Sequence, residues 1–202
     1  MYGLPKIHEP GAPLRPILSM TNAPQHELAK WLAELLQPVV CKYGVHTVKD
    51  TFEFCENIDA CAAECDITGS YMCSFDATSL FTNIPLRDTV QLCLDALYRD
   101  QDIVKPPMPE AEFAKLLYKA TTDVEFSFNG KMYRQIDRLA MGSPLGPDLA
   151  NNFVGHCESR VDPEKWPMFY NRFVDDTFTI FPSKEESDSF FEVLNSMHLA
   201  SS

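Results

Sequence analysis

Two adjacent aspartates, Asp175 and Asp176, are the first residues of this sequence whose type and spacing point to chemistry. They lie within positions 171–180, between two short runs of aromatic and β-branched residues, and such runs favour β-strands. An acidic pair at the tip of a hairpin can place a carboxylate beside a divalent cation. Because neighbouring side chains of a strand point to opposite faces, the two aspartates are expected to have different roles. Taken alone, however, an Asp pair is more often a tight turn than a metal site.

A third carboxylate, Asp76, ends a run at positions 71–76 that is typical of a buried strand. If its strand neighbours the Asp175 strand in one sheet, Asp76 and Asp175 converge on a pair of divalent cations. A two-metal site stabilises both the attacking and the leaving oxygen of an in-line phosphoryl displacement. Magnesium prefers carboxylate, water and phosphate oxygens. The pattern therefore indicates phosphoryl transfer, although the spacing alone does not establish that the carboxylates meet.

The elements that must position these carboxylates are helices and hairpins in mixed order. Prolines and glycines keep residues 1–20 extended or in a loose hairpin. The pair Asn129-Gly130 between two β-prone runs predicts a further hairpin over residues 124–135. Helices are expected over residues 24–38, 50–63, 85–98, 110–120, 148–160 and 184–197. Because strands and helices do not alternate regularly, the order predicts an α+β fold with an antiparallel sheet.

Single residues mark the ends of several of these helices. Pro38 is expected to end the first helix, and Thr51 to cap the second. Pro85 is expected to open the third helix. Ser183 is expected to open the last one.

Composition limits the class of protein and its location. The 202 residues are the size of one domain, and 45% hydrophobic residues with 14 Phe can fill a sizeable core. No run of about 18 apolar residues and no signal-peptide pattern is present, so neither a membrane span nor secretion is expected. Seven cysteines without a CxxC pair indicate free thiols in a reducing compartment, the nucleus or the cytoplasm. The net charge of −12 argues against nucleic-acid binding, because phosphate binding calls for Lys and Arg.

Four short blocks nevertheless follow one another in a recognisable order. They are Leu-Arg-Pro-Ile at 14–17, Ser-Phe-Asp at 74–76, Ala-Met-Gly-Ser-Pro-Leu-Gly-Pro at 140–147 and Phe-Val-Asp-Asp at 173–176. In this order they resemble the fingers-and-palm core of reverse transcriptases. Further stretches are similar to Penelope-like retroelements: Tyr-Gly-Leu-Pro-Lys-Ile-His at 2–8, Ser-Leu-Phe-Thr-Asn-Ile-Pro at 79–85, and residues 140–151. The resemblance covers nearly the whole chain.

The resemblance implies the roles of the acidic residues. Asp76 and Asp175 resemble the two main metal-binding carboxylates of a polymerase palm. Asp176 resembles the third catalytic acidic residue, which contributes less direct coordination. The main-chain carbonyl of Ala77 would be a further metal ligand. Two Mg²⁺ ions are the implied cofactors, with Mn²⁺ as a substitute.

The resemblance also implies five nucleotide-binding residues. Phe81 matches the aromatic gate beneath the incoming sugar, where its ring would clash with a ribose 2′-hydroxyl. Lys6 and Arg15 fall where the fingers supply cations to the triphosphate. Met141 and Gly142 line up with the loop beneath the templating base pair. Gly142 is expected to permit close approach of the backbone to substrate or template.

The implied fold is a right-hand polymerase palm, an antiparallel sheet with packed helices, joined to part of the fingers. Residues 1–70 would be the fingers-like segment, and residues 71–202 the palm with inserted fingers elements. The thumb is expected to be missing, because the chain stops soon after its last helix. The implied function is the RNA-directed DNA polymerase core of a retrotransposable element. Its partners would be an RNA template, a DNA primer and deoxynucleoside triphosphates.

Two departures from the family pattern keep alternatives open. Glu9 stands where the family has a basic residue, and Arg138 where Gly usually follows Asp137, so a positive φ at Arg138 would be strained. These departures favour an inactive fragment or a decayed copy of such an element. A different palm polymerase that makes RNA is a second alternative, against which Phe81 argues. A non-enzymatic acidic binding protein, with the Asp pair as a mere turn, is the third.

Overall fold

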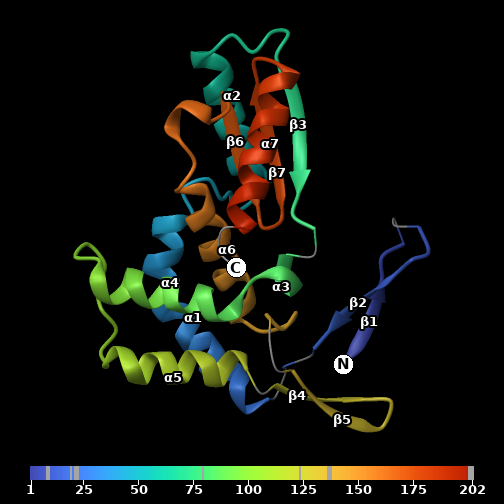
Figure 1. Cartoon of the computed structure of the whole chain (residues 1–202), viewed down its shortest axis with the longest axis vertical. Coiled ribbons are helices and arrows are strands. Elements are labelled where there is room, and N and C mark those ends of the chain that lie inside the picture. Colours follow the sequence, from blue (N-terminus) through green and yellow to red (C-terminus); the bar gives the residue numbers. More distant parts are fainter. Residues whose placement is uncertain are drawn as a thin grey trace. The chain divides into compact units, whose positions relative to one another are not determined.

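The structure is a computed structural model, and it describes residues 1–7, 10–18, 20, 23–78, 80–122, 124–135 and 138–199. The chain forms two compact units (Figure 1). The first unit comprises Met1–Cys41 and Ser79–Asn152, and the second comprises Lys42–Thr78 and Phe153–Ser202. The expected departure at Glu9, like Asp137, lies outside the described residues.

A three-stranded antiparallel sheet is the centre of the second unit, with the order β3-β7-β6. Its strands are β3 (Tyr71–Asp76), β6 (Phe169–Phe173) and β7 (Asp176–Phe181). The central strand β7 pairs with β3 so that Tyr71 is opposite Phe181 and Asp76 is opposite Asp176. The register therefore brings the end of β3 and the turn of the β6–β7 hairpin to the same end of the sheet.

Aromatic side chains pack a helix on each face of this sheet. The helices are α2 (Thr51–Glu64) and α7 (Lys184–Leu199), drawn in teal and red in Figure 1. On α2, Phe54 meets Phe178 edge to face, with ring centroids 5.4 Å apart. On α7, Phe190 contacts Phe181 at the same centroid distance. Because Phe178 and Phe181 are three residues apart on one strand, they point to opposite faces, and the two helices enclose the sheet.

The first unit consists of helices and two separate hairpins. Strands β1 (Tyr2–Pro5) and β2 (Leu14–Ile17) form one hairpin, and β4 (Val124–Phe128) and β5 (Lys131–Gln135) form the other. The second hairpin turns at Asn129 and Gly130 with φ of 49° and 72°, as the Asn-Gly signal predicted. The helices lying wholly within the unit are α3 (Leu80–Asn83), α4 (Leu86–Arg99) and α5 (Glu110–Thr121). Val90 and Leu97 of α4 are buried and contribute to the hydrophobic core of the first unit.

Two longer helices begin in the first unit and end in the second. They are α1 (Pro24–Tyr43) and α6 (Leu145–Glu158). Among the described residues, no helix is both long and apolar enough to cross a membrane. A short 3₁₀ turn, η1 (Pro163–Lys165), lies between α6 and β6.

The structure corrects several expected element boundaries. Helix α1 continues through Pro38 to Tyr43, because burial of residues such as Leu36 and Val39 outweighs the backbone hydrogen bond that proline removes. The cap of α2 is Asp50 rather than Thr51, since its carboxylate accepts a 2.9 Å hydrogen bond from the Glu53 N–H.

Two further corrections concern α6 and β3. Helix α6 begins at Leu145 rather than near Asp148, because the Ser143 hydroxyl accepts a hydrogen bond from the Leu145 N–H and starts the helix earlier. Strand β3 is not buried, because its side chains alternate between exposed and partly buried along the outer edge of the sheet. The predicted cap of α7 is confirmed, since Ser183 Oγ accepts from the Glu186 N–H at 3.3 Å. The mixed helices and antiparallel sheets confirm the predicted α+β class.

Candidate functional site

The three predicted catalytic carboxylates lie at one end of the sheet in the second unit. Strands β6 and β7 are joined by a two-residue turn, Val174 and Asp175, because Phe173 pairs directly with Asp176. On the adjacent strand Asp76 is opposite Asp176. The Ala77 N–H, immediately after β3, donates a 3.0 Å hydrogen bond to the Asp175 carbonyl. This bond ties the turn to the end of β3.

The register separates the aspartates by position. Residues directly opposite one another in an antiparallel pair have side chains on the same face. Asp76 and Asp176 therefore share a face, and both are exposed. Asp175 lies in the turn and is partly buried. The pairing partner of Asp76 is thus Asp176, a relation that the spacing of the sequence did not reveal.

The carboxylates fit a magnesium site in donor chemistry. Within the described ranges, no three His, Cys, Asp or Glu side chains are gathered closely enough to hold a metal ion by themselves. Magnesium characteristically uses one or two protein carboxylates, and water and substrate phosphate oxygens complete its shell. A pair of these carboxylates at the exposed end of the sheet, with the Ala77 main chain beside it, has the donor chemistry that such a site requires.

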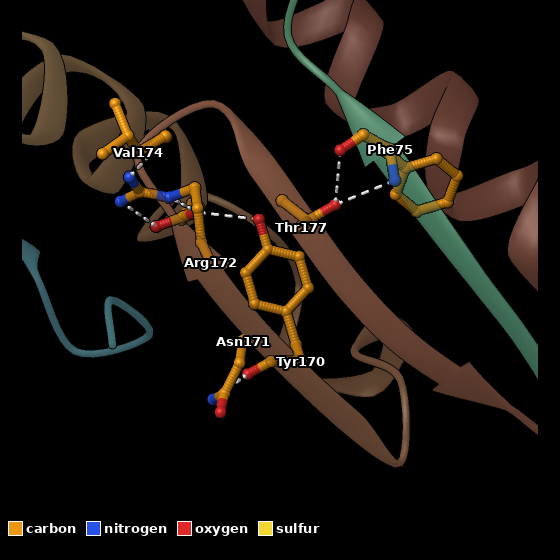
Figure 2. Close-up of polar contacts among 7 residues, drawn as sticks. Phe75, Tyr170, Asn171, Arg172, Val174 and Thr177 are labelled. Carbon is orange, nitrogen blue, oxygen red and sulfur yellow. Dashed lines mark hydrogen bonds and ion pairs between the residues drawn. The ribbon is translucent and has the colours of Figure 1, made fainter. Parts of the chain in front are cut away.

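The turn that carries Asp175 is strained and is supported from within the protein. Val174 has a φ of +58°, which is an outlier for a β-branched residue. Arg172 Nη1 donates a 3.1 Å hydrogen bond to the Val174 carbonyl. Arg172 is itself paired with Glu158 at the end of α6, with 2.6 Å between Nε and Oε1. Figure 2 shows Arg172 reaching Val174 beside Tyr170.

Sequence reasoning missed Glu158, Tyr170 and Arg172. Tyr170 and Arg172 alternate along β6, which indicates that they share a face but not which face is buried. Glu158 lies fourteen residues before Arg172 in the chain, and no spacing rule connects a helix end with a later strand in this way. The only signal in the sequence was a charged residue, Arg172, in a short strand that contains three aromatic residues.

Side-chain bonds also fasten β3 to β7 beside the carboxylates. Thr177 Oγ1 donates to the Phe75 carbonyl and accepts from the Phe75 N–H, each at 3.1 Å (Figure 2). Both residues directly precede or follow an aspartate, Phe75 before Asp76 and Thr177 after Asp176. The two threonine bonds therefore restrict sliding of β3 against β7 at the site.

Burial controls the ionisation of the tyrosine beneath the turn. Desolvation raises the pKa of Tyr170, and the Glu158 carboxylate, 2.7 Å from the phenol oxygen, raises it further. Tyr170 therefore stays neutral and donates its O–H to Glu158. Burial also lowers the pKa of His46, which stacks on Trp166 with ring centroids 4.2 Å apart.

The first unit contains the five predicted nucleotide-binding residues, and three of them come from helix α3 and from the loop that precedes α6. The Leu18 N–H donates to the Met141 carbonyl at 2.9 Å, and the Leu139 N–H donates to the Phe81 carbonyl at 3.2 Å. The Phe81 ring lies against Gly146 in the first turn of α6. These contacts bring Phe81, Met141 and Gly142 into the same region of the first unit.

Gly142 permits a close backbone approach within the protein itself. It has a φ of +115°, and a Cβ at this position would overlap the Leu18 carbonyl oxygen. The close approach that glycine permits in this structure is therefore to the protein's own backbone. Any approach of substrate or template stays a prediction.

The two predicted cationic residues belong to the β1–β2 hairpin. Arg15 is exposed and pairs across the hairpin with Leu4. Lys6 is partly buried, and its N–H donates to the Pro13 carbonyl at 2.9 Å. Arg138 adopts the positive φ that was predicted to be strained, at 72°, while its guanidinium donates to the Asn83 carbonyl at 2.9 Å. That hydrogen bond offsets part of the cost of the strained backbone.

Comparison with known proteins supports the fold. No family model and no curated protein matches the chain. Among solved structures, it is similar to apo telomerase from Candida tropicalis truncated from its C-terminal domain, with a TM-score of 0.59 and 11% identity over 86% of this chain. It is also similar to telomerase from Candida albicans in complex with a TWJ fragment of telomeric RNA, with a TM-score of 0.62 and 12% identity over 83% of this chain. The chain spans 37% and 32% of the length of those proteins. The likeness shows a polymerase palm-type fold.

Proposed function

We propose that this chain is the fingers-and-palm part of an RNA-directed DNA polymerase of a retrotransposable element, of the kind found in Penelope-like elements. The proposal rests on one observation, the arrangement at the end of the three-stranded sheet. There Asp76 is opposite Asp176, and the Ala77 N–H donates a hydrogen bond to the Asp175 carbonyl. The chain that carries this arrangement is similar in fold to two telomerases. Residues 1–70 would serve as the fingers-like segment and residues 71–202 as the palm.

In this proposal the acidic residues divide the work of phosphoryl transfer. Asp76 and Asp175, with the Ala77 carbonyl, would hold two Mg²⁺ ions, and Mn²⁺ would substitute. When bound, the ions would activate the primer 3′-hydroxyl and neutralise charge on the triphosphate. Asp176 would be auxiliary, since its exposed carboxylate lies beside Asp76 and adds negative charge that attracts the cations.

The residues of the first unit would bind the incoming nucleotide. Arg15 and Lys6 would contact the triphosphate, because a guanidinium fork and an ammonium both suit phosphate oxygens. Phe81 would exclude a ribose 2′-hydroxyl, so that deoxynucleotides are preferred. Met141 and Gly142 would lie beneath the templating base pair.

The proposed partners are an RNA template and a DNA primer, and the proposed location of the protein is inside the cell. The net charge of −12 opposes contact with their phosphates, and this favours a second candidate, an inactive piece of such a polymerase. Bound cations and the basic side chains of the β1–β2 hairpin would counter that repulsion locally. Primer extension by the 202-residue chain separates the two candidates.

The decisive experiment is extension of a DNA primer on an RNA template with Mg²⁺. Asp76→Asn and Asp175→Asn are each expected to reduce extension by about 1,000-fold, which corresponds to about 4 kcal/mol of transition-state stabilisation. Neither aspartate belongs to the hydrophobic core, so the loss of extension would reflect the missing carboxylates rather than misfolding. Extension is measured by single-nucleotide gel resolution under steady-state conditions.

A matched control removes a carboxylate elsewhere in the same unit. Asp188→Asn, on an exposed position of α7, makes the same change in net charge and is expected to leave extension unchanged. Wild-type rates in either Asp76→Asn or Asp175→Asn would reject the site. If the unmodified chain does not extend primers, line broadening by Mn²⁺ in NMR spectra at Ala77 and Asp176 still tests whether the sheet edge holds a metal.

A further inference from the structure

A buried ion pair between Arg172 and Glu158 lies next to the Val174–Asp175 turn. The side chains of Arg172 and Glu158 are 1% and 2% exposed. They meet through two hydrogen bonds, Nε to Oε1 at 2.6 Å and Nη2 to Oε2 at 3.2 Å. Tyr170 donates a third bond to the same carboxylate at 2.7 Å. Such a pair is a poor source of stability, because desolvating two charges offsets most of their attraction.

The remaining face of the guanidinium has a specific partner. Arg172 Nη1 donates to the carbonyl of Val174, the residue in the turn with a φ of +58° (Figure 2). A valine is unfavourable in that conformation, so surrounding contacts must hold it there. The guanidinium provides such a contact because its fork has donors on two sides.

The main chain of Arg172 is fixed independently of its side chain. Its N–H donates to the His46 carbonyl at 2.8 Å, and its carbonyl accepts from the Val48 N–H at 2.9 Å. The base of the side chain is thus anchored to a neighbouring segment of the same unit. On the far side of the turn, the Asp175 carbonyl accepts from Ala77. The turn is therefore held at one end by Arg172 and at the other by β3.

We infer that Arg172, oriented by Glu158, is a positioning residue that holds the Val174–Asp175 turn against the end of β3. Its effect on the turn follows from the contacts alone. Its effect on catalysis rests on the proposed function, because a turn that shifts would displace the Asp175 carboxylate from Asp76. Glu158 acts through Arg172, since it contacts the guanidinium and not the turn.

Arg172→Lys is the informative variant. It keeps the positive charge for Glu158. It replaces the three nitrogens that contact the two Glu158 oxygens and the Val174 carbonyl with one ammonium nitrogen, which is not expected to reach all three acceptors. The first readout is amide hydrogen exchange of Ala77 by NMR, because this N–H reports the bond to the turn. It is expected to exchange about tenfold faster, while the amides of the β6–β7 pairing change little.

Kinetics supply the second readout. The Mg²⁺ concentration for half-maximal primer extension is expected to rise about tenfold and kcat to fall about 100-fold, because a small displacement of a catalytic group has a large effect on rate. The KM for the nucleotide is expected to change by less than about threefold, since the nucleotide-binding residues lie in the first unit. A general loss of folding would instead reduce the amount of active protein and leave the Mg²⁺ dependence unchanged.

Tyr170→Phe is the matched control. It removes the 2.7 Å hydrogen bond that the Tyr170 hydroxyl donates to Glu158, but it leaves the bond from Arg172 to the Val174 carbonyl in place. It is expected to leave Ala77 exchange and the Mg²⁺ dependence as in the unmodified chain. Equal changes in Tyr170→Phe and Arg172→Lys, or slow Ala77 exchange in Arg172→Lys, would overturn the positioning role.

The failure of the proposed function would look different. In that case Asp175→Asn would not alter extension, or no extension would occur, whereas Ala77 exchange would still accelerate in Arg172→Lys. If only the positioning role is wrong, Asp175→Asn abolishes extension and Arg172→Lys leaves Ala77 exchange unchanged. Circular dichroism of both variants establishes that the exchange is measured on folded protein.

Discussion

At the scale of single residues, two unfavourable backbone conformations are each accompanied by a specific hydrogen bond. Val174 and Arg138 have positive φ although neither is glycine, and both have their carbonyl or side chain in a specific hydrogen bond. Strained conformations of this kind persist only where the surrounding structure imposes them. Gly142 has a positive φ for a different reason, since its missing Cβ leaves room for the Leu18 carbonyl.

Gly142→Ala is expected to destabilise the protein by about 2–4 kcal/mol, because the backbone strain adds to an overlap with a neighbouring backbone oxygen. Gly130→Ala is the control, since Gly130 has a φ of 72° but a Cβ added there would meet nothing within 4 Å. This control should lose only about 1 kcal/mol. Urea unfolding measures both. Equal losses for the two variants would mean that the Leu18 contact contributes nothing.

At the scale of elements, α1 shows how packing overrides a local signal. Its interior Pro38 removes a backbone donor, yet the helix continues for five residues beyond it, to Tyr43. Leu32, Leu36 and Val39 are fully buried along one side of the helix. Helical stability in proteins comes mainly from such packing rather than from propensity. The local rule identified an unfavourable residue but not the end of the element.

Pro38→Ala is expected to raise the free energy of unfolding by about 1–3 kcal/mol, because the helix regains a hydrogen bond and loses a steric conflict. Pro147→Ala is the matched control. Pro147 lies in the first turn of α6, where its missing N–H has no partner in the helix, so a change below about 0.5 kcal/mol is expected. Urea unfolding midpoints of the two variants provide the comparison. A loss of stability in Pro38→Ala would contradict this account of α1.

At the scale of the whole molecule, charge is the dominant global property. The chain has 29 acidic and 17 basic residues, so its net charge is −12. Most acidic groups lie at the surface, but Asp148 on α6 is partly buried, and Gln37 is 3.4 Å from its carboxylate. Desolvation raises the pKa of Asp148 to about 6, and the Gln37 hydrogen bond opposes that shift only in part.

Asp148 is therefore expected to reduce stability as the pH rises. Its folded-state pKa exceeds its unfolded value of 3.8, so the folded state binds the proton more tightly. Its contribution is most favourable below about pH 4 and is lost as the pH rises through about 6. Asp148→Asn should remove this loss, so the variant should gain stability relative to the unmodified chain between pH 4 and pH 7. Urea unfolding across that range measures the difference.

The control for this pH dependence is Asp188→Asn, which makes the same change in net charge at an exposed position. A parallel rise in both variants would assign the effect to net charge rather than to the partly buried Asp148 carboxylate.

Much of the architecture could be predicted from local sequence because the signals were local. Three of these features depend on residues that are neighbours in the chain: the Asn129-Gly130 turn, the Ser183 cap and the hairpin that turns at Asp175. The residues that pair across the fold could not be predicted in this way. Glu158 with Arg172, and Leu18 with Gly142, are far apart in sequence, and no periodicity relates them.

The sequence by itself determined the α+β class and the presence of an acidic hairpin, because both follow from chain-local propensities and turn chemistry. The tertiary structure alone decided which carboxylates are neighbours, since strand register places Asp76 opposite Asp176 and bonds Ala77 to Asp175. It also decided that a buried guanidinium supports the strained turn. Register and burial depend on contacts between distant segments, which arise only when those segments pack together.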